Sequence, residues 1–141
     1  MVLIDTTIWS LALRRRSQDL NDQERRLTAR WAALIESGHA ALIGPIRQEI
    51  LSGIRVPAHF DGIRAQLDSF RYLAVSQVDY DEAAQFFNRC RTHGIAAGDV
   101  DMLICAVAAR WRVPIFTTDK DFSHYAKRLP IRLFENEQPG D

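Results

Sequence analysis

The chain has 141 residues and a mass of 16.1 kDa, which is enough for one domain with a hydrophobic core and too little for two. Hydrophobic residues make up 47% and charged residues 26%, as in ordinary globular proteins. Because 18 Lys and Arg balance 18 Asp and Glu, the composition excludes a bulk positive field, and any contact with nucleic acid must use a local patch.

Two other features of the sequence favour a cytoplasmic protein. Cys90 and Cys105 both lie among apolar residues of predicted helices, which is typical of reduced core thiols. The first 20 residues contain an apolar strand followed by a basic run, the reverse of the order in a secretory signal. No apolar run approaches the length that a membrane-spanning helix needs, so we expect no membrane association.

The apolar run at residues 2–4 predicts a short buried strand, and Asp5 follows it directly. In open α/β sheets, ligands bind beyond the carboxyl ends of the strands, so Asp5 is a candidate site residue. A cap for the next helix explains Asp5 equally well. Thr6 or Thr7 is the other candidate for this cap, because hydroxyl oxygens accept hydrogen bonds from the first helical N–H groups.

Three consecutive arginines, Arg14, Arg15 and Arg16, follow the first predicted helix. A basic run at a helix end is usually solvated and interacts favourably with the helix dipole. Contact with RNA phosphates is the alternative, and it remains open. The next segment, residues 21–37, has the spacing of an amphipathic helix that begins with a capping box and stops before Gly38.

Residues 40–43 predict a second strand, and Pro45 suits the first position of the helix expected over residues 46–52. This helix carries Glu49 on or near its apolar face. A surface glutamate beside Arg47 is an equally good explanation when Glu49 is considered alone.

The middle of the chain has an architectural pattern. Residues 59–70 predict an amphipathic helix and residues 72–75 a third short strand. Asp79, with Glu82 three residues later, is expected to cap a further helix that ends at Gly94.

The stretch 98–122 places four aspartates at the two ends of an apolar segment: Asp99, Asp101, Asp119 and Asp121. Residues 100–109 are apolar at nearly every position, which predicts a helix packed on most sides, and residues 115–116 predict a buried strand. Capping explains one acid at each helix start but not two. An unpaired carboxylate at Asp101, in the first turn of a buried helix, is costly.

The remaining residues complete an α/β domain. Residues 122–128 predict a short helix, 131–133 an edge strand and 135–141 a polar C-terminal tail. We find no repeat or linker, so residues 1–134 are expected to form one α/β/α domain with a mostly parallel sheet of four or five strands.

Four carboxylates lie just past a predicted strand or in the opening turns of the helix that follows one: Asp5, Glu49, Asp101 and Asp119. If they converge they repel one another, so the cluster needs protons or a cation between its members. Oxygen ligands select hard ions such as Mg²⁺ or Mn²⁺. Such a site suits phosphodiester hydrolysis, in which metals activate the attacking water.

The sequence resembles the PIN-domain ribonucleases, particularly the VapC toxins of toxin–antitoxin operons, in four segments that keep the family order: DTTIW (5–9), RQEILSG (47–53), GDVDMLICAVA (98–108) and TTDKDF (117–122). The resemblance covers nearly the whole chain and implies that residues 1–134 are a PIN domain. It also implies an endoribonuclease that uses Mg²⁺ or Mn²⁺ held by Asp5, Glu49, Asp101 and Asp119. Thr7, Asp99 and Asp121 match positions that support such a site.

The same resemblance implies two protein partners, a second copy in a homodimer and a VapB-like antitoxin that places a basic side chain among the carboxylates. The antitoxin groove is expected around Trp9 and Leu13 and along the helix at 21–37, although these residues suit the core equally well. The competing hypothesis is a non-catalytic PIN-like module that binds RNA or protein, which would be expected to have lost some of the acids.

Overall fold

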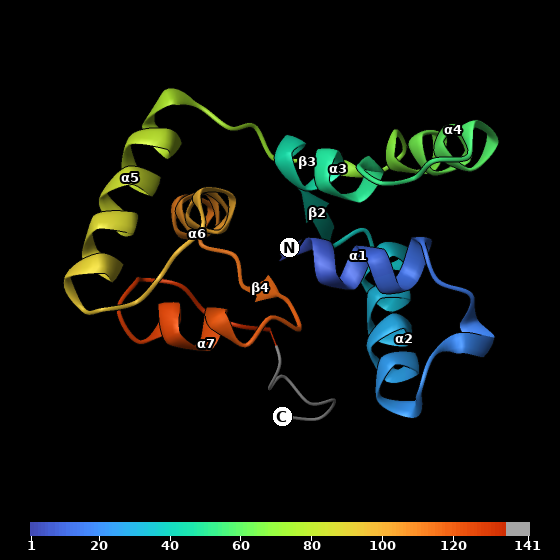
Figure 1. Cartoon of the computed structure of the whole chain (residues 1–141), viewed down its shortest axis with the longest axis horizontal. Coiled ribbons are helices and arrows are strands. Elements are labelled where there is room, and N and C mark those ends of the chain that lie inside the picture. The colour runs from blue at the N-terminus through green and yellow to red at the C-terminus, as the bar shows by residue number, and fades with distance from the viewer. Residues whose placement is uncertain (135–141) are drawn as a thin grey trace.

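The computed structural model describes residues 1–134, in which a four-stranded parallel sheet lies between two groups of helices (Figure 1). The strand order is β3-β2-β1-β4. The strands are β1 (Val2–Ile4), β2 (Ala40–Leu42), β3 (Arg71–Tyr72) and β4 (Ile115–Phe116). The predicted α/β/α fold with a mostly parallel sheet is therefore confirmed. The polar tail predicted at 135–141 lies outside the described residues.

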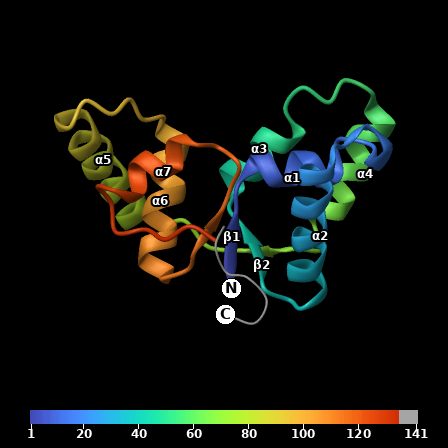
Figure 2. The same ribbon diagram turned by 90° about the horizontal axis from the view of Figure 1, so that it is seen from below.

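Two groups of helices cover the sheet. Figure 2 shows α1 to α4 on one side of β1 and β2, and α5, α6 and α7 on the other. The helices are α1 (Thr6–Leu13), η1 (Ser17–Asp19, a 3-10 turn), α2 (Asp22–Glu36), α3 (Gly44–Leu51), α4 (Pro57–Leu67), α5 (Gln77–Thr92), α6 (Asp99–Trp111) and α7 (Asp121–Ala126). None of the helices in residues 1–134 combines the length and hydropathy needed to cross a membrane.

The central strand β1 sets the position of the candidate site. Leu3 pairs with Ala41 of β2 and with Ile115 of β4, and all three residues of β1 are buried. A strand covered on both faces needs a continuous apolar run, which residues 2–4 supply. Because the strands are parallel, the residues that follow β1, β2 and β4 emerge at the same edge of the sheet.

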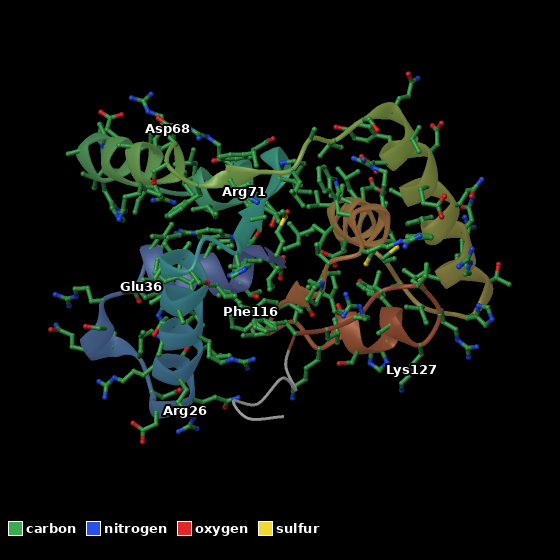
Figure 3. All side chains as sticks on the ribbon, turned by 180° about the vertical axis from the view of Figure 1, so that it is seen from behind. Arg26, Glu36, Asp68, Arg71, Phe116 and Lys127 are labelled. Atoms are coloured by element: carbon green, nitrogen blue, oxygen red, sulfur yellow. The ribbon has the colours of Figure 1, made fainter. Side chains whose placement is uncertain are left out.

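Helix α6 forms the middle of the core on the α5 side of the sheet. Its residues 102–108 are all buried, as the continuous apolar pattern predicts. Figure 3 shows Phe116 of β4 in the interior and the labelled side chains of Arg26 and Lys127 pointing outward. Asp101, in the first turn of this helix, is therefore held on a rigid element.

Most predicted boundaries are within two residues of the observed ones, and three elements differ by more or in kind. Helix α4 begins at Pro57, whose fixed φ suits the first helical turn, and ends at Leu67 instead of Phe70. Strand β3 covers residues 71–72 where 72–75 was predicted. Residues 131–133 form a single parallel bridge, between Leu133 and Ile115, instead of an edge strand.

The predicted cap of α5 is wrong. Ser76 is the N-cap residue, and its backbone N–H donates to Oδ2 of Asp79 at 2.9 Å. Asp79 therefore lies within the first turn, where its carboxylate also accepts two hydrogen bonds from Arg110 of α6. The prediction was three residues late because Ser76 with Asp79 and Asp79 with Glu82 both have the spacing of a cap, and the sequence alone does not select between them.

Candidate active site

A cavity of about 610 Å³ lies at the edge of the sheet where the parallel strands end. Five elements contribute acids to its wall: the β1–α1 junction, α2 with Glu24, α3, α6 and the loop after β4. The structure thus brings all four of the predicted ligand residues to one cavity, namely Asp5, Glu49, Asp101 and Asp119. Threonines from the β1–α1 junction and the loop after β4 also line it, namely Thr6, Thr7 and Thr118.

Asp5 is the most deeply placed of these acids, with 5% of its surface exposed. Its Oδ2 accepts hydrogen bonds from Thr117 Oγ1 at 2.7 Å and from Thr7 Oγ1 at 3.1 Å. Burial raises the pKa of Asp5 above its ordinary value, while the two hydroxyl groups partly oppose this shift by stabilising the carboxylate. Asp5 is the N-cap residue of α1 by position, but its side chain accepts no capping hydrogen bond.

Neither threonine at the start of α1 caps the helix, so this prediction is wrong. Thr6 Oγ1 donates to Oε2 of Glu49 at 2.9 Å, and Thr7 Oγ1 donates to Asp5 and accepts from the backbone N–H of Thr118 at 3.1 Å. Both hydroxyls therefore orient carboxylates of the cavity.

Asp101, in the first turn of α6, lines the same cavity as Asp5 and is partly buried. The buried hydroxyl of Tyr125 in α7 donates to its Oδ2 at 3.1 Å. Burial, followed by repulsion from Asp5, Asp119 and Glu49, raises the pKa of Asp101 to about 6, and the Tyr125 hydrogen bond only partly offsets this. The same burial and the facing carboxylate raise the pKa of the Tyr125 hydroxyl.

The two aspartates after β4 have different positions. Asp119 lines the cavity, and its Oδ1 accepts a hydrogen bond from the backbone N–H of Asp121 at 2.9 Å. Asp121 is exposed and does not line the cavity. Asp99 is exposed as well and lines a separate apolar cavity beside Tyr80 and Phe87 of α5. Of these two aspartates, Asp119 therefore shares the cavity with the other acids.

Only one of the three consecutive arginines reaches the cavity. Arg15 lines it, together with Glu24 and Leu27 of α2. Arg16 forms an exposed ion pair with Asp19 at 3.3 Å and is not part of the wall. Arg14 is exposed and is not part of the wall either.

The chemistry of the donor set fits a hard divalent cation. All four acids offer carboxylate oxygens, and the raised pKa values of Asp5 and Asp101 reflect burial first and repulsion from neighbouring carboxylates second. A bound cation would offset both effects. Within residues 1–134, however, no three His, Cys, Asp or Glu side chains stand close enough to hold one ion as they are placed. To hold one ion between three of these side chains, the carboxylates would have to move toward a shared centre.

Sequence reasoning missed three residues that orient these acids: Thr6 as a partner of Glu49, Thr117 and Tyr125. Thr117 lies two residues before Asp119, so its place in the TTDKDF segment was the available signal. Tyr125 had no such signal, because it reaches Asp101 across 24 positions and from a different helix.

The chain is similar to known proteins in sequence pattern and in fold. A sequence model described as "PIN domain" matches residues 2–128. No curated protein sequence is significantly similar. Among solved structures, FitAcB from Neisseria gonorrhoeae superimposes with a TM-score of 0.74 at 22% identity, covering 95% of this chain and 96% of that chain.

Two other solved structures have the same fold. VapBC2 from Rickettsia felis, bound to a DNA fragment from its promoter, gives a TM-score of 0.70 at 16% identity and covers 94% of this chain and 97% of that chain. The Mycobacterium tuberculosis toxin VapC20 is described as cleaving the sarcin-ricin loop. It superimposes with a TM-score of 0.69 at 17% identity, covering 94% of this chain and 99% of that chain. At such identities the similarity establishes a shared fold.

Proposed function

The chain belongs to the PIN domain family, and from this premise we propose that it is a Mg²⁺- or Mn²⁺-dependent endoribonuclease, the toxin of a VapBC-type toxin–antitoxin module. The observation that carries the proposal is the meeting of Asp5, Glu49, Asp101 and Asp119 in one cavity at the ends of the parallel strands. Its support is physical: clustered carboxylates with raised pKa values are stabilised by a cation, and they suit phosphodiester hydrolysis.

The chain's own residues prepare this site. Asp5, Asp101, Asp119 and Glu49 would hold the metal, which when bound supplies a Lewis acid that activates water and stabilises the leaving oxygen. Thr117 and Thr7 restrain the carboxylate of Asp5, and Tyr125 restrains that of Asp101. Since these hydroxyls donate hydrogen bonds, they favour the ionised carboxylates that metal binding requires.

A non-catalytic PIN-like module that binds RNA or protein is the alternative function. Such a module has no need of crowded carboxylates, which cost stability when no cation is present. The presence of all four acids, each with a place in the cavity, therefore favours the enzyme.

Metal-dependent cleavage is the decisive experiment. Purified protein is expected to cut structured RNA at discrete positions with Mg²⁺ or Mn²⁺, to lose this activity in EDTA, and to regain it when the metal is restored in excess. Products should be resolved on denaturing gels. Cleavage that persists fully in EDTA would contradict the metal mechanism, and RNA binding without cleavage in any divalent metal would favour the non-catalytic module.

We further propose a VapB-like antitoxin as partner, because the similar structures include toxin–antitoxin complexes. A basic side chain of the antitoxin would pair with the carboxylates and occupy the space that a metal needs. The antitoxin groove cannot be built around Trp9, as the sequence suggested, because Trp9 is fully buried and packs against Trp31 and Phe70. Co-purification with the product of an adjacent reading frame would test this partner.

The proposed homodimer has structural support on the α5 side. Val78 and Tyr80 are exposed by 65% and 55%, and Tyr80 borders the apolar cavity between α3, α5 and α6. Apolar side chains exposed beside an apolar cavity are typical of an interface. Sedimentation equilibrium should therefore give a dimer mass at micromolar concentration, whereas a monomer mass alone would contradict the proposal.

A further inference from the structure

The wall of the cavity combines the four clustered carboxylates with residues from the segment after α1 and from α2, where Arg15 is paired with Glu24. Of the residues within 1–134 that line the cavity, Arg15 is the only Lys or Arg. An RNA chain that reaches the acids must bring phosphates next to them, and a cation in the same wall offsets the repulsion.

Arg15 is held in place by two hydrogen bonds. Its Nη1 donates to Glu24 Oε2 at 3.0 Å and its Nη2 to the backbone oxygen of Asp19 at 3.3 Å. Its side chain is 45% exposed, so the remaining guanidinium N–H groups can reach a ligand. An exposed ion pair of this kind contributes little to the stability of the fold. Stability therefore does not account for an arginine at this place in the cavity wall.

Glu24 divides its two oxygens between different tasks. Oε1 accepts from the backbone N–H of Asn21 at 3.0 Å in the capping box of α2, and Oε2 accepts from Arg15. The hydrogen bond at the start of α2 therefore fixes the position of the Glu24 side chain, and Glu24 in turn orients the guanidinium of Arg15. A phosphate that binds Arg15 must compete with this carboxylate, or share the guanidinium with it.

We propose that Arg15 binds a phosphate of the RNA that enters the cavity, and that Glu24 positions Arg15 and limits its affinity for this phosphate. This inference rests on the proposed function for its ligand. It separates Arg15 from its two neighbours, because Arg16 is paired with Asp19 away from the cavity wall and Arg14 is not part of the wall.

The test measures binding of a fluorescein-labelled, mixed-sequence RNA of about 12 nucleotides by anisotropy in EDTA. Arg15→Ala is expected to weaken binding about tenfold, as loss of a charge-assisted phosphate contact does. It should also reduce the slope of log affinity against log salt by about 0.7, the value for one phosphate on a single strand. Arg16→Ala, the matched control, should change affinity less than about twofold.

Glu24→Gln supplies the opposite change. Gln can keep the capping box through its amide oxygen but removes the negative charge beside Arg15, so binding should become several-fold tighter. Equal effects of Arg15→Ala and Arg16→Ala would overturn the proposal, and so would unchanged affinity in Glu24→Gln. Because the assay needs no cleavage, failure of the proposed nuclease activity would be seen separately, in the metal experiment.

Discussion

Asp5→Asn and Asp101→Asn are each expected to reduce metal-dependent RNA cleavage on the order of 100-fold or more, because each change removes a ligand charge while it preserves side-chain size. Both residues line the cavity and are held by hydroxyl groups that would then face a neutral amide. Initial rates at saturating Mg²⁺ provide the measurement. Parent-like cleavage by either variant would remove that residue from the mechanism.

The same substitution at Asp101 should increase stability when metal is absent. The folded-state pKa of Asp101 is raised to about 6 from 3.8, so between these values the folded chain binds more protons than the unfolded chain. The contribution of Asp101 to the free energy of unfolding therefore falls as pH rises from about 4 to about 6. Asp101→Asn should abolish this loss and gain about 1 kcal/mol at pH 7, after allowance for partial exposure.

Urea unfolding in EDTA at pH 4.5 and pH 7 checks this expectation. Asp99→Asn is the matched control, since Asp99 lies two residues earlier on the same helix but is exposed and outside the acidic cavity. Asp99→Asn should change neither the rate of RNA cleavage nor the pH dependence of the free energy of unfolding appreciably. If Asp101→Asn is less stable than the parent at pH 7 in EDTA, the surroundings stabilise the carboxylate, and burial and repulsion do not dominate.

Asp79→Ala is expected to cost about 2 kcal/mol of unfolding free energy, the largest stability effect that we predict, because it removes charge-assisted hydrogen bonds but leaves a guanidinium that solvent can reach. Asp79 is 1% exposed, and its oxygens accept from Arg110 Nε at 2.6 Å and Nη2 at 2.8 Å. Arg110 also donates to the backbone oxygen of Ala74 at 2.9 Å. The substitution removes a charge-assisted connection between α5, α6 and the loop before α5.

The pH dependence of this effect has the opposite sign from that of Asp101. The guanidinium of Arg110 holds the pKa of Asp79 below its ordinary value, so the ion pair stabilises the fold above the usual carboxyl pKa of 3.8 and is lost as pH falls below it. Asp61→Ala is the control, because its pair with Arg64 is exposed and should matter by less than about 0.5 kcal/mol. Equal stability losses for Asp79→Ala and Asp61→Ala, measured in urea at pH 7, would contradict this account.

The sequence by itself determined the features that depend on neighbouring residues. Apolar runs at 2–4, 40–43 and 115–116 and the buried helix after Gly98 each appear in the structure, because burial on both faces of a strand or all around a helix requires a local run of apolar residues. The predicted strand ends also located Asp5 and Asp119, because the carboxyl ends of parallel strands lie at the same edge of the sheet.

Tertiary structure alone decided which side chains meet. The sequence favoured helix caps for Thr6 and Asp79, whereas Thr6 binds Glu49 across 43 positions, and Asp79 binds Arg110 across 31 in addition to its partner Ser76. Likewise, four aspartates in the stretch 98–122 appeared similar, yet only Asp101 and Asp119 line the acidic cavity. The physical reason is that a capping motif is encoded within four residues. A partner brought by another helix depends on how the helices pack against the sheet, and no local pattern records that arrangement.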